Sequence, residues 1–143
     1  MSSNLIPPST TIWGPHGWKF LHYVSLGYPE HPTEEDKINY KNFFISIKNI
    51  LPCIICSNHY AENYDKIPLT DAILSDKTSL VRWVIDIHNV VNKSKNKRIV
   101  PYDEALALIN TDTVCNNDNS NCLYTWLFIL CGLIIIALIY RKK

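Results

Sequence analysis

Residues 76–94 read DKTSLVRWVIDIHNVVNKS and carry the clearest periodicity in the chain. Their large apolar side chains recur at intervals of three and four residues, which places them on one face of an α-helix. These side chains are Leu80, Trp83, Val84, Ile87 and Val91. The stretch therefore predicts a long amphipathic helix that buries one face against other helices.

Four other segments show helical patterning. A first helix contains WGPHGWKFLH and ends at Gly27 and Pro29, and a second opens at Thr33, with Asp36 in the position of a capping-box partner. A third begins at Pro52 and ends before Pro68, and a short fifth covers residues 102–109. The sequence shows neither a pair of strands nor a Gly-rich phosphate loop. We predict an all-α fold, a four-helix bundle plus a short fifth helix.

The segments at the two ends differ in composition from this helical domain, which we place at residues 12–110. Residues 1–11 have the character of a flexible arm, without the pattern of a signal peptide, and residues 111–122 form a polar linker. Residues 123–140 are almost wholly apolar, and 18 residues of helix span about 27 Å, close to the roughly 30 Å hydrocarbon core. A buried core helix is the alternative, but we predict a single C-terminal transmembrane helix followed by a basic tail, residues 141–143.

Two rules conflict on the orientation of this helix. A lone C-terminal anchor without a signal peptide indicates tail-anchored insertion, which leaves the domain in the cytosol. Arg141, Lys142 and Lys143 follow the helix, however, and the positive-inside rule would place them in the cytosol instead. We expect the tail-anchored arrangement, because three basic residues are a weaker barrier to translocation than a folded domain. The virion and the endoplasmic reticulum are the candidate membranes.

Charge and cysteine content narrow the function. The formal net charge is +1, which gives no electrostatic case for binding nucleic acid. Two of the five cysteines, Cys53 and Cys56, form a Cys-x-x-Cys pair in LPCIICSNHY, residues 51–60. A helix N-terminus after Pro52 would stabilise a thiolate and favour thiol–disulfide exchange. Half of a metal site and a plain structural pair are the alternatives, although further ligands at metal-site spacing are lacking.

The residues around this pair resemble the Erv/ALR family of flavin-dependent sulfhydryl oxidases. The resemblance covers residues 13 to about 110, in three blocks that occur in the family's order. The first block is a W-x-x-x-H stretch at Trp18 and His22, and the second is the Cys-x-x-Cys pair. The third is an H-N-x-x-N stretch whose members are His88, Asn89 and Asn92, with Lys97 beyond it.

The resemblance implies a function. Members hold FAD at the mouth of a small helical bundle, oxidise dithiols to disulfides and pass the electrons to molecular oxygen, which gives hydrogen peroxide. It also implies that Cys56 lies against the flavin while Cys53 exchanges with substrate. Dithiol client proteins or a thioredoxin-like intermediary are the expected partners, together with a second copy of the chain in a homodimer. The resemblance to small single-domain members would suit a protein of a large DNA virus that forms its own disulfides in the cytosol.

The residues themselves suit this cofactor, because a flavin needs aromatic and apolar surfaces for its ring and cations for its phosphates. The predicted FAD-binding residues are Gly14, Trp18, His22, Tyr60, Trp83, His88, Asn89, Val91, Asn92, Lys95 and Lys97, and we predict no metal site. A tryptophan in a helical stripe is more often a core residue, and a lysine run is more often a solvated surface. His16 and His31 are expected on the surface, and His59 lies near the pair.

The chain departs from the family in one place. Many members have a structural disulfide whose cysteines align with Ile85 and Tyr102 here, so packing must replace that bond. Cys115 and Cys122 could form a shuttle disulfide that relays electrons from the client, or a local loop disulfide. Cys131 is expected to be inert within the apolar segment.

Two other classes of function remain as alternatives to the oxidase. One is a membrane-anchored, flavin-free thiol–disulfide exchanger. The other is a non-catalytic module that binds thiols or a metal.

Overall fold

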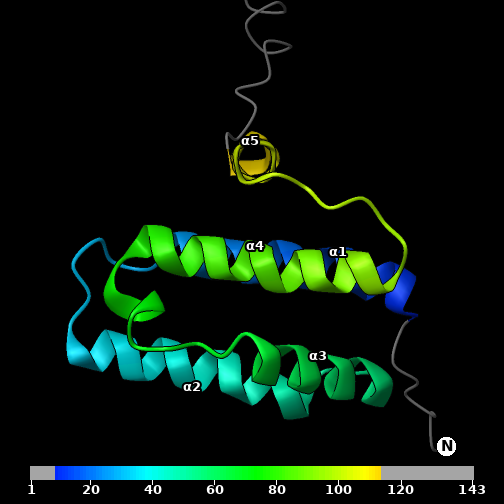
Figure 1. The fold of residues 1–143 in the computed structure, drawn as a ribbon, viewed down its shortest axis with the longest axis horizontal. Helices are drawn as coiled ribbons and strands as arrows, with labels where there is room; N and C mark the ends of the chain where they lie inside the picture. Colours follow the sequence, from blue (N-terminus) through cyan, green and yellow to red (C-terminus); the bar gives the residue numbers. More distant parts are fainter. Residues whose placement is uncertain (1–8, 114–143) are drawn as a thin grey trace, which may run out of the picture. The chain divides into compact units, whose positions relative to one another are not determined.

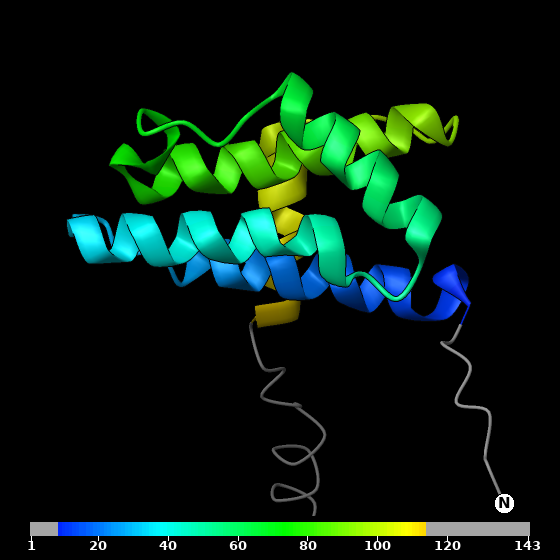
Figure 2. The same ribbon diagram turned by 90° about the horizontal axis from the view of Figure 1, so that it is seen from below.

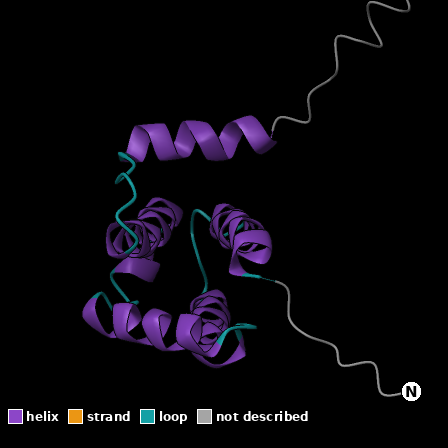
Figure 3. Cartoon of the chain, turned by 90° about the vertical axis from the view of Figure 1, so that its right-hand side faces the viewer, coloured by secondary structure: helices purple, strands orange, loops and turns teal. Residues whose placement is uncertain are grey.

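The computed structural model describes residues 9–113, with side chains described for residues 9–110. These residues form five α-helices and one short 3₁₀ turn, and they contain no strand (Figures 1 and 3). The elements are α1 (Thr10–Leu26), α2 (Glu34–Ile50), α3 (Ile54–Lys66), η1 (Ile73–Ser75), α4 (Lys77–Ser94) and α5 (Tyr102–Thr113). The predicted all-α fold, with four longer helices and a fifth, is confirmed for this part of the chain.

Capping residues explain where the helices begin. Thr33 accepts a hydrogen bond from the Asp36 backbone N–H at 3.2 Å, and the Asp36 carboxylate accepts one from the Thr33 backbone N–H at 2.9 Å. This is the predicted capping box at the start of α2. Asp76 caps α4 in the same way, because its carboxylate accepts a hydrogen bond from the Ser79 N–H at 2.9 Å. Both caps satisfy backbone donors that have no partner within the helix.

Three helix ends differ from those that the pattern indicates. Helix α3 begins at Ile54, with Cys53 as its N-cap, and not at Pro52. Helix α1 begins at Thr10, capped by Ser9, so it takes in the last residues of the expected flexible arm. Helix α5 continues to Thr113, past residue 109, so the expected linker starts within a helix. A serine or threonine cap and a run of helix-compatible polar residues give weaker signals than an apolar stripe.

The main core lies among α1, α2, α3 and α4 and is rich in aromatic side chains. Phe44 of α2 and Tyr64 of α3 each meet Trp83 of α4 edge-to-face, with ring centroids 5.1 and 5.8 Å apart. Leu74 of η1 and Leu80 of α4 are fully buried in the same cluster. Burial of this apolar surface is the main source of stability for the bundle.

A second, smaller cluster joins α4 to α5. Val81 and Ile85 of α4 are buried together with Ala105 and Ile109 of α5.

No helix within residues 9–113 is long and apolar enough to cross a membrane. The predicted transmembrane segment 123–140 lies outside the described residues, and so do Cys115, Cys122 and Cys131.

Candidate functional site

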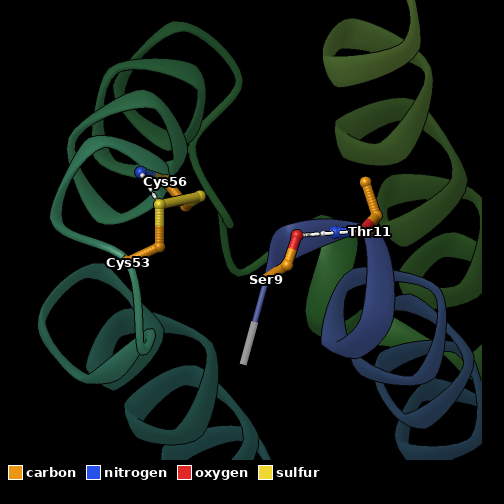
Figure 4. Close-up of a disulfide and its surroundings, with 4 residues drawn as sticks. All are labelled: Ser9, Thr11, Cys53 and Cys56. Atoms are coloured by element: carbon orange, nitrogen blue, oxygen red, sulfur yellow. Dashed lines mark hydrogen bonds between the residues drawn. A yellow bond between two sulfur atoms is a disulfide. The ribbon is translucent and has the colours of Figure 1, made fainter. Parts of the chain in front are cut away.

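The Cys53–Cys56 pair forms a disulfide at the start of α3, with the two Cα atoms 5.1 Å apart. Cys53 is the N-cap residue, and its Sγ accepts a hydrogen bond from the backbone N–H of Cys56 at 3.2 Å (Figure 4). The sequence placed both cysteines in the first turn, whereas Cys53 immediately precedes it. Both residues are partly exposed.

Several helix ends, including the C-terminus of α2, lie together at one end of the bundle. Figures 1 and 2 show the N-termini of α1 and α3 and the C-terminus of α4 at the same end. The close-up of the disulfide in Figure 4 includes Ser9 and Thr11 from the start of α1. This arrangement brings the Cys-x-x-Cys pair to the same end as the residues at the end of α4.

Trp18, His22 and His88 form an aromatic cluster between α1 and α4. The rings of Trp18 and His88 are stacked, with centroids 4.1 Å apart and planes 5° apart. The Nε2 atom of His22 lies 3.0 Å from the Nδ1 atom of His88, within hydrogen-bonding distance. The structure thus brings together three residues that the sequence assigned to one site from two separate motifs.

Burial keeps both histidines neutral near pH 7. Desolvation lowers the pKa of His22 from 6.5 to about 4. Desolvation likewise lowers the pKa of His88 to about 4, with smaller contributions from the charges of His22 and Lys97. A neutral imidazole carries one N–H, so one ring of the pair donates to the other.

Two buried polar atoms on α1 have no hydrogen-bond partner among the described residues. They are Nδ1 of His22 and Nε1 of Trp13. A Cβ atom built on Gly14 would meet nothing within 4 Å, so open space lies beside this glycine. A buried polar atom without a partner costs free energy, and a ligand that supplied one would recover it. These residues of α1 therefore fit a bound group with polar atoms and a flat apolar surface.

Asn89 holds the loop that follows α4. Its side-chain amide donates to the Val100 carbonyl at 2.9 Å, and its side-chain oxygen accepts from the Val100 N–H at 3.0 Å. Both polar ends of the side chain are therefore engaged within the protein. The H-N-x-x-N motif predicted a cofactor contact at Asn89, and the structure gives it a clear role in shaping the loop.

The C-terminus of α4 ends in a Schellman motif that fixes the positions of the lysines. Asn96 adopts a positive φ of 53°, and its N–H donates to the Lys93 carbonyl at 3.1 Å. The Lys97 N–H donates to the Asn92 carbonyl at 2.8 Å, which completes the motif. Lys95 and Lys97 are exposed on this turn, and Asn92 and Val91 are partly buried beside it. Cations at a helix C-terminus are favourably placed, and they remain available to an anionic ligand.

Tyr60 and Trp83 lie in the main core. Tyr60 is 4% exposed, and its hydroxyl donates to the Phe44 carbonyl at 3.0 Å. Trp83 is also 4% exposed, and its indole N–H donates to the Ile67 carbonyl at 2.8 Å. Both side chains therefore have complete packing and hydrogen bonding within the bundle. Their contact with a cofactor stays a prediction.

Packing and a hydrogen bond join α4 to α5 at Ile85 and Tyr102, the two positions where the family resemblance implies a disulfide in other members. Ile85 is 2% exposed within the second cluster. The Tyr102 hydroxyl donates to the Asp86 carboxylate, and the Arg82 guanidinium lies over the Tyr102 ring, 5.4 Å from its centroid. These contacts connect the same two helices that the relatives' disulfide would link.

The sequence analysis did not include Trp13 among the candidate site residues. Its position directly before Gly14 was a signal, but one tryptophan in a helix is usually a core residue. The structure shows that its indole N–H is buried without a partner.

His16, His31 and His59 are exposed. Within residues 9–113, no group of three or more His, Cys, Asp or Glu side chains could hold a metal ion.

Residues 15–111 match the model of the Erv1/Alr family. The chain belongs to the Erv1/Alr family. This match spans all three motifs that the sequence singled out, from the tryptophan and histidine of α1 to the H-N-x-x-N stretch of α4.

The chain is also similar to individual proteins that are named as FAD-linked sulfhydryl oxidases. The chain is 47% identical over 117 residues to a protein of Acanthamoeba polyphaga mimivirus called "Probable FAD-linked sulfhydryl oxidase", covering 82% of this chain and 80% of the relative. It is 30% identical over 92 residues to the FAD-linked sulfhydryl oxidase of an African swine fever virus isolate, covering 64% and 75%.

Solved structures show the same fold. The yeast Erv1 core superposes with a TM-score of 0.61 at 27% identity, covering 70% of this chain and 82% of that one. The FAD binding domain of Erv1 from Saccharomyces cerevisiae gives a TM-score of 0.62 at 26% identity, covering 66% and 88%.

Proposed function

We propose that this chain is an FAD-linked sulfhydryl oxidase, which oxidises dithiols to disulfides through Cys53 and Cys56 and passes the electrons to molecular oxygen. The observation that carries the proposal is the partly exposed Cys53–Cys56 disulfide at the end of the bundle that also holds the ends of α1 and α4. Membership of the Erv1/Alr family supports it.

The cysteine chemistry follows from thiol–disulfide exchange. A substrate thiolate attacks Sγ of Cys53, the Cys53–Cys56 bond breaks, and its electron pair remains on Sγ of Cys56 as a thiolate. The second substrate thiolate then attacks the substrate sulfur of the mixed disulfide, and Cys53 leaves as a thiolate. The Cys56 N–H already lies 3.2 Å from Sγ of Cys53, and it stabilises that leaving thiolate.

FAD, when bound, would accept the two electrons from the reduced cysteine pair and deliver them to oxygen. Trp18, His22 and His88 would hold its apolar ring system, and the unpaired Nδ1 of His22 would hydrogen-bond to it. Lys95 and Lys97 would neutralise its phosphates, with Asn92 and Val91 beside them. Gly14 leaves open space at the start of α1, which a bound group can occupy.

A simple experiment tests the proposed function. The purified full-length chain should be yellow, release FAD on denaturation and consume oxygen when dithiothreitol is added. A colourless protein that exchanges disulfides without consuming oxygen would support the flavin-free alternative instead. A colourless protein that carries zinc would support a metal-binding module.

A homodimer is the second part of the proposal. Exposed apolar side chains lie on α1 and α2, where a partner would bury them: Ile12 at 61%, Phe20 at 58%, Ile38 at 57% and Ile45 at 38%. Phe20 contacts Phe43 edge-to-face across the two helices, so the exposed ring belongs to a surface shared by both. Sedimentation should give twice the chain mass, and Phe20→Asp with Ile38→Asp should give a monomer. A wild-type monomer at micromolar concentration would contradict the proposal.

The third part concerns membranes and the remaining cysteines. Residues 123–140 have the length and composition of a membrane anchor, and a cytosolic catalytic domain follows from tail-anchored insertion. On membranes that carry the full-length chain, protease should then degrade the bundle without detergent. If only residues 141–143 are accessible, the orientation is the reverse.

A Cys115–Cys122 shuttle predicts that Cys115→Ser with Cys122→Ser slows oxidation of protein clients more than oxidation of dithiothreitol.

A further inference from the structure

The residues around the disulfide form an exposed apolar surface, which we call the redox-end patch: Ile50, Pro52, Ile54 and Ile55. Ile54 and Ile55 are the two residues between the cysteines, and they are 81% and 65% exposed. Ile50, the last residue of α2, is 66% exposed. Ile54 has the highest exposure of the exposed large hydrophobic residues in the described part of the chain.

This composition disfavours the helix that it begins. The first turn of a helix favours acidic side chains, which interact with the helix dipole, and β-branched residues have low helix propensity. Helix α2 follows this rule with Glu34, Glu35 and Asp36 in its first turn, whereas the first turn of α3 contains no acidic residue. The two isoleucines recover little of this cost by packing within the chain, because most of their surface is exposed. Their exposed surface is therefore available for contact with another molecule.

The redox-end patch is also uncharged. Residues 49–58 contain no ionisable side chain apart from the two cysteines, and the flanking Lys48 forms an ion pair with Asp65 at 2.6 Å. A charged substrate segment would find no opposite charge within this stretch. No carboxylate within this stretch repels an incoming thiolate. The favourable contribution to docking here is burial of apolar surface.

We propose that Ile54 and Ile55 determine substrate specificity by binding an apolar side chain next to the attacking cysteine of a dithiol polypeptide. The inference rests on the proposed function and names the class of substrate that this site takes. In the step that the patch assists, the substrate sulfur forms a bond to Sγ of Cys53, the Cys53–Cys56 bond breaks, and the electron pair goes to Sγ of Cys56. The two isoleucines hold the substrate chain during this attack.

The occupant must be a substrate segment rather than a permanent partner. Ile54 and Ile55 are linked directly to the two cysteines, so a second copy of the chain fixed on the patch would cover the disulfide. Exchange requires the substrate sulfur to reach Cys53, and each product must then leave. A transient contact with an apolar side chain satisfies both requirements.

Anaerobic exchange kinetics test the proposal without relying on flavin or oxygen. The full-length protein is mixed, in separate reactions, with each of three reductants. Two are reduced Cys-x-x-Cys peptides, one flanked by leucine and the other by serine, and the third is dithiothreitol. Loss of the Cys53–Cys56 disulfide is followed by quenching and alkylation. The variants are Ile54→Ser with Ile55→Ser, a rescue variant with leucine at both positions, and the control Ile99→Ser, whose parent side chain is 54% exposed.

We expect the serine variant to react about tenfold more slowly with the leucine-flanked peptide, a difference of about 1.4 kcal/mol. Its rates with dithiothreitol and with the serine-flanked peptide should stay within about twofold of wild type, since neither offers the apolar side chain. The leucine variant should recover the wild-type rate, and Ile99→Ser should match wild type throughout.

Three results would overturn the inference. The first is an unchanged rate of the serine variant with the leucine-flanked peptide. The second is an equal fall in its rates with all three reductants, which would mean that the isoleucines act on the disulfide itself. The third is loss of the peptide preference in Cys115→Ser with Cys122→Ser, which would mean that the patch serves the chain's own segment. Oxygen consumption is measured separately, so a failed oxidase assay with preserved peptide preference would reject the proposed oxidase alone.

Discussion

The indole ring of Trp18 and the imidazole ring of His88 lie parallel, with centroids 4.1 Å apart and planes 5° apart. They come from α1 and α4, and His22 joins them through the 3.0 Å contact between Nε2 and Nδ1. A desolvated and neutral histidine pair is sensitive to acid, because protonation would place a charge in a poorly solvated position. The cluster therefore couples the stability of the bundle to pH.

We expect stability to fall as the pH drops below about 6.5, the pKa of an unfolded histidine. The folded pKa of both His22 and His88 is about 4, so between these values the unfolded chain binds more protons and stability rises with pH. The full effect is on the order of 3 kcal/mol per ring. Denaturant unfolding at pH 7.0, 6.0 and 5.0 measures it.

A histidine elsewhere provides the control for this pH dependence. His88→Phe should roughly halve the pH dependence between pH 7 and 5, because His22 remains buried, whereas His31→Gln, which removes an exposed histidine, should leave the slope unchanged. Hydrogen bonds lower the pKa values of Asp36 and Asp76, so these carboxylates affect stability only below about pH 4. They therefore do not contribute to the pH dependence between pH 7 and 5. A constant free energy of unfolding from pH 7 to 5 would show that the pair is not desolvated in solution.

Replacing either cysteine of the pair should abolish dithiol oxidation. Cys53→Ser removes the sulfur that the substrate attacks, and Cys56→Ser removes the sulfur that leaves in that step. Each variant should lose at least about 100-fold in oxygen consumption with dithiothreitol, because a hydroxyl cannot form the disulfide. Cys131→Ser is the matched control and should retain activity. Full turnover by Cys53→Ser or Cys56→Ser would refute the redox assignment.

Asn89→Ala should destabilise the protein by about 1–3 kcal/mol, since the Val100 N–H and carbonyl each lose a partly buried partner. The control Asn42→Ala removes an exposed asparagine from α2 and should change stability by less than about 0.5 kcal/mol. Chemical unfolding measures both variants. If Asn89→Ala loses FAD but unfolds like wild type, its main role is in the cofactor site instead.

The helices were predictable because their signals are local. Thr33 and Asp36 fix the start of α2 by a three-residue spacing, and the apolar stripe of α4 gives its extent and buried face. The stacking of Trp18 on His88 was not predictable from periodicity, because it depends on how α1 and α4 pack. Only the resemblance to a family placed those two motifs in one site.

Residues with two plausible roles could not be resolved from sequence. Trp83 has the spacing of a core residue and the chemistry of a flavin contact, and the structure shows complete packing and a bonded indole N–H. The double hydrogen bond from Asn89 to Val100 joins residues eleven apart through a loop whose path no pattern encodes. The exposure of Ile54 and Ile55 likewise depends on how the helices of residues 9–113 pack around the first turn of α3, which no local pattern encodes.

Loss of cofactor contacts at the end of α4 should lower FAD retention and thermal stability together. His88→Ala with Asn92→Ala removes the ring stacked on Trp18 and a partly buried amide beside the C-terminal turn. A ligand that binds the folded state alone stabilises it, so weaker binding lowers the melting temperature in proportion to the logarithm of affinity. We expect substoichiometric FAD after purification, and a melting temperature that rises when FAD is added back. Lys66→Ala, an exposed lysine at the end of α3, is the control and should keep full flavin content. If the double variant keeps full FAD content and melts like wild type, His88 and Asn92 do not hold the cofactor.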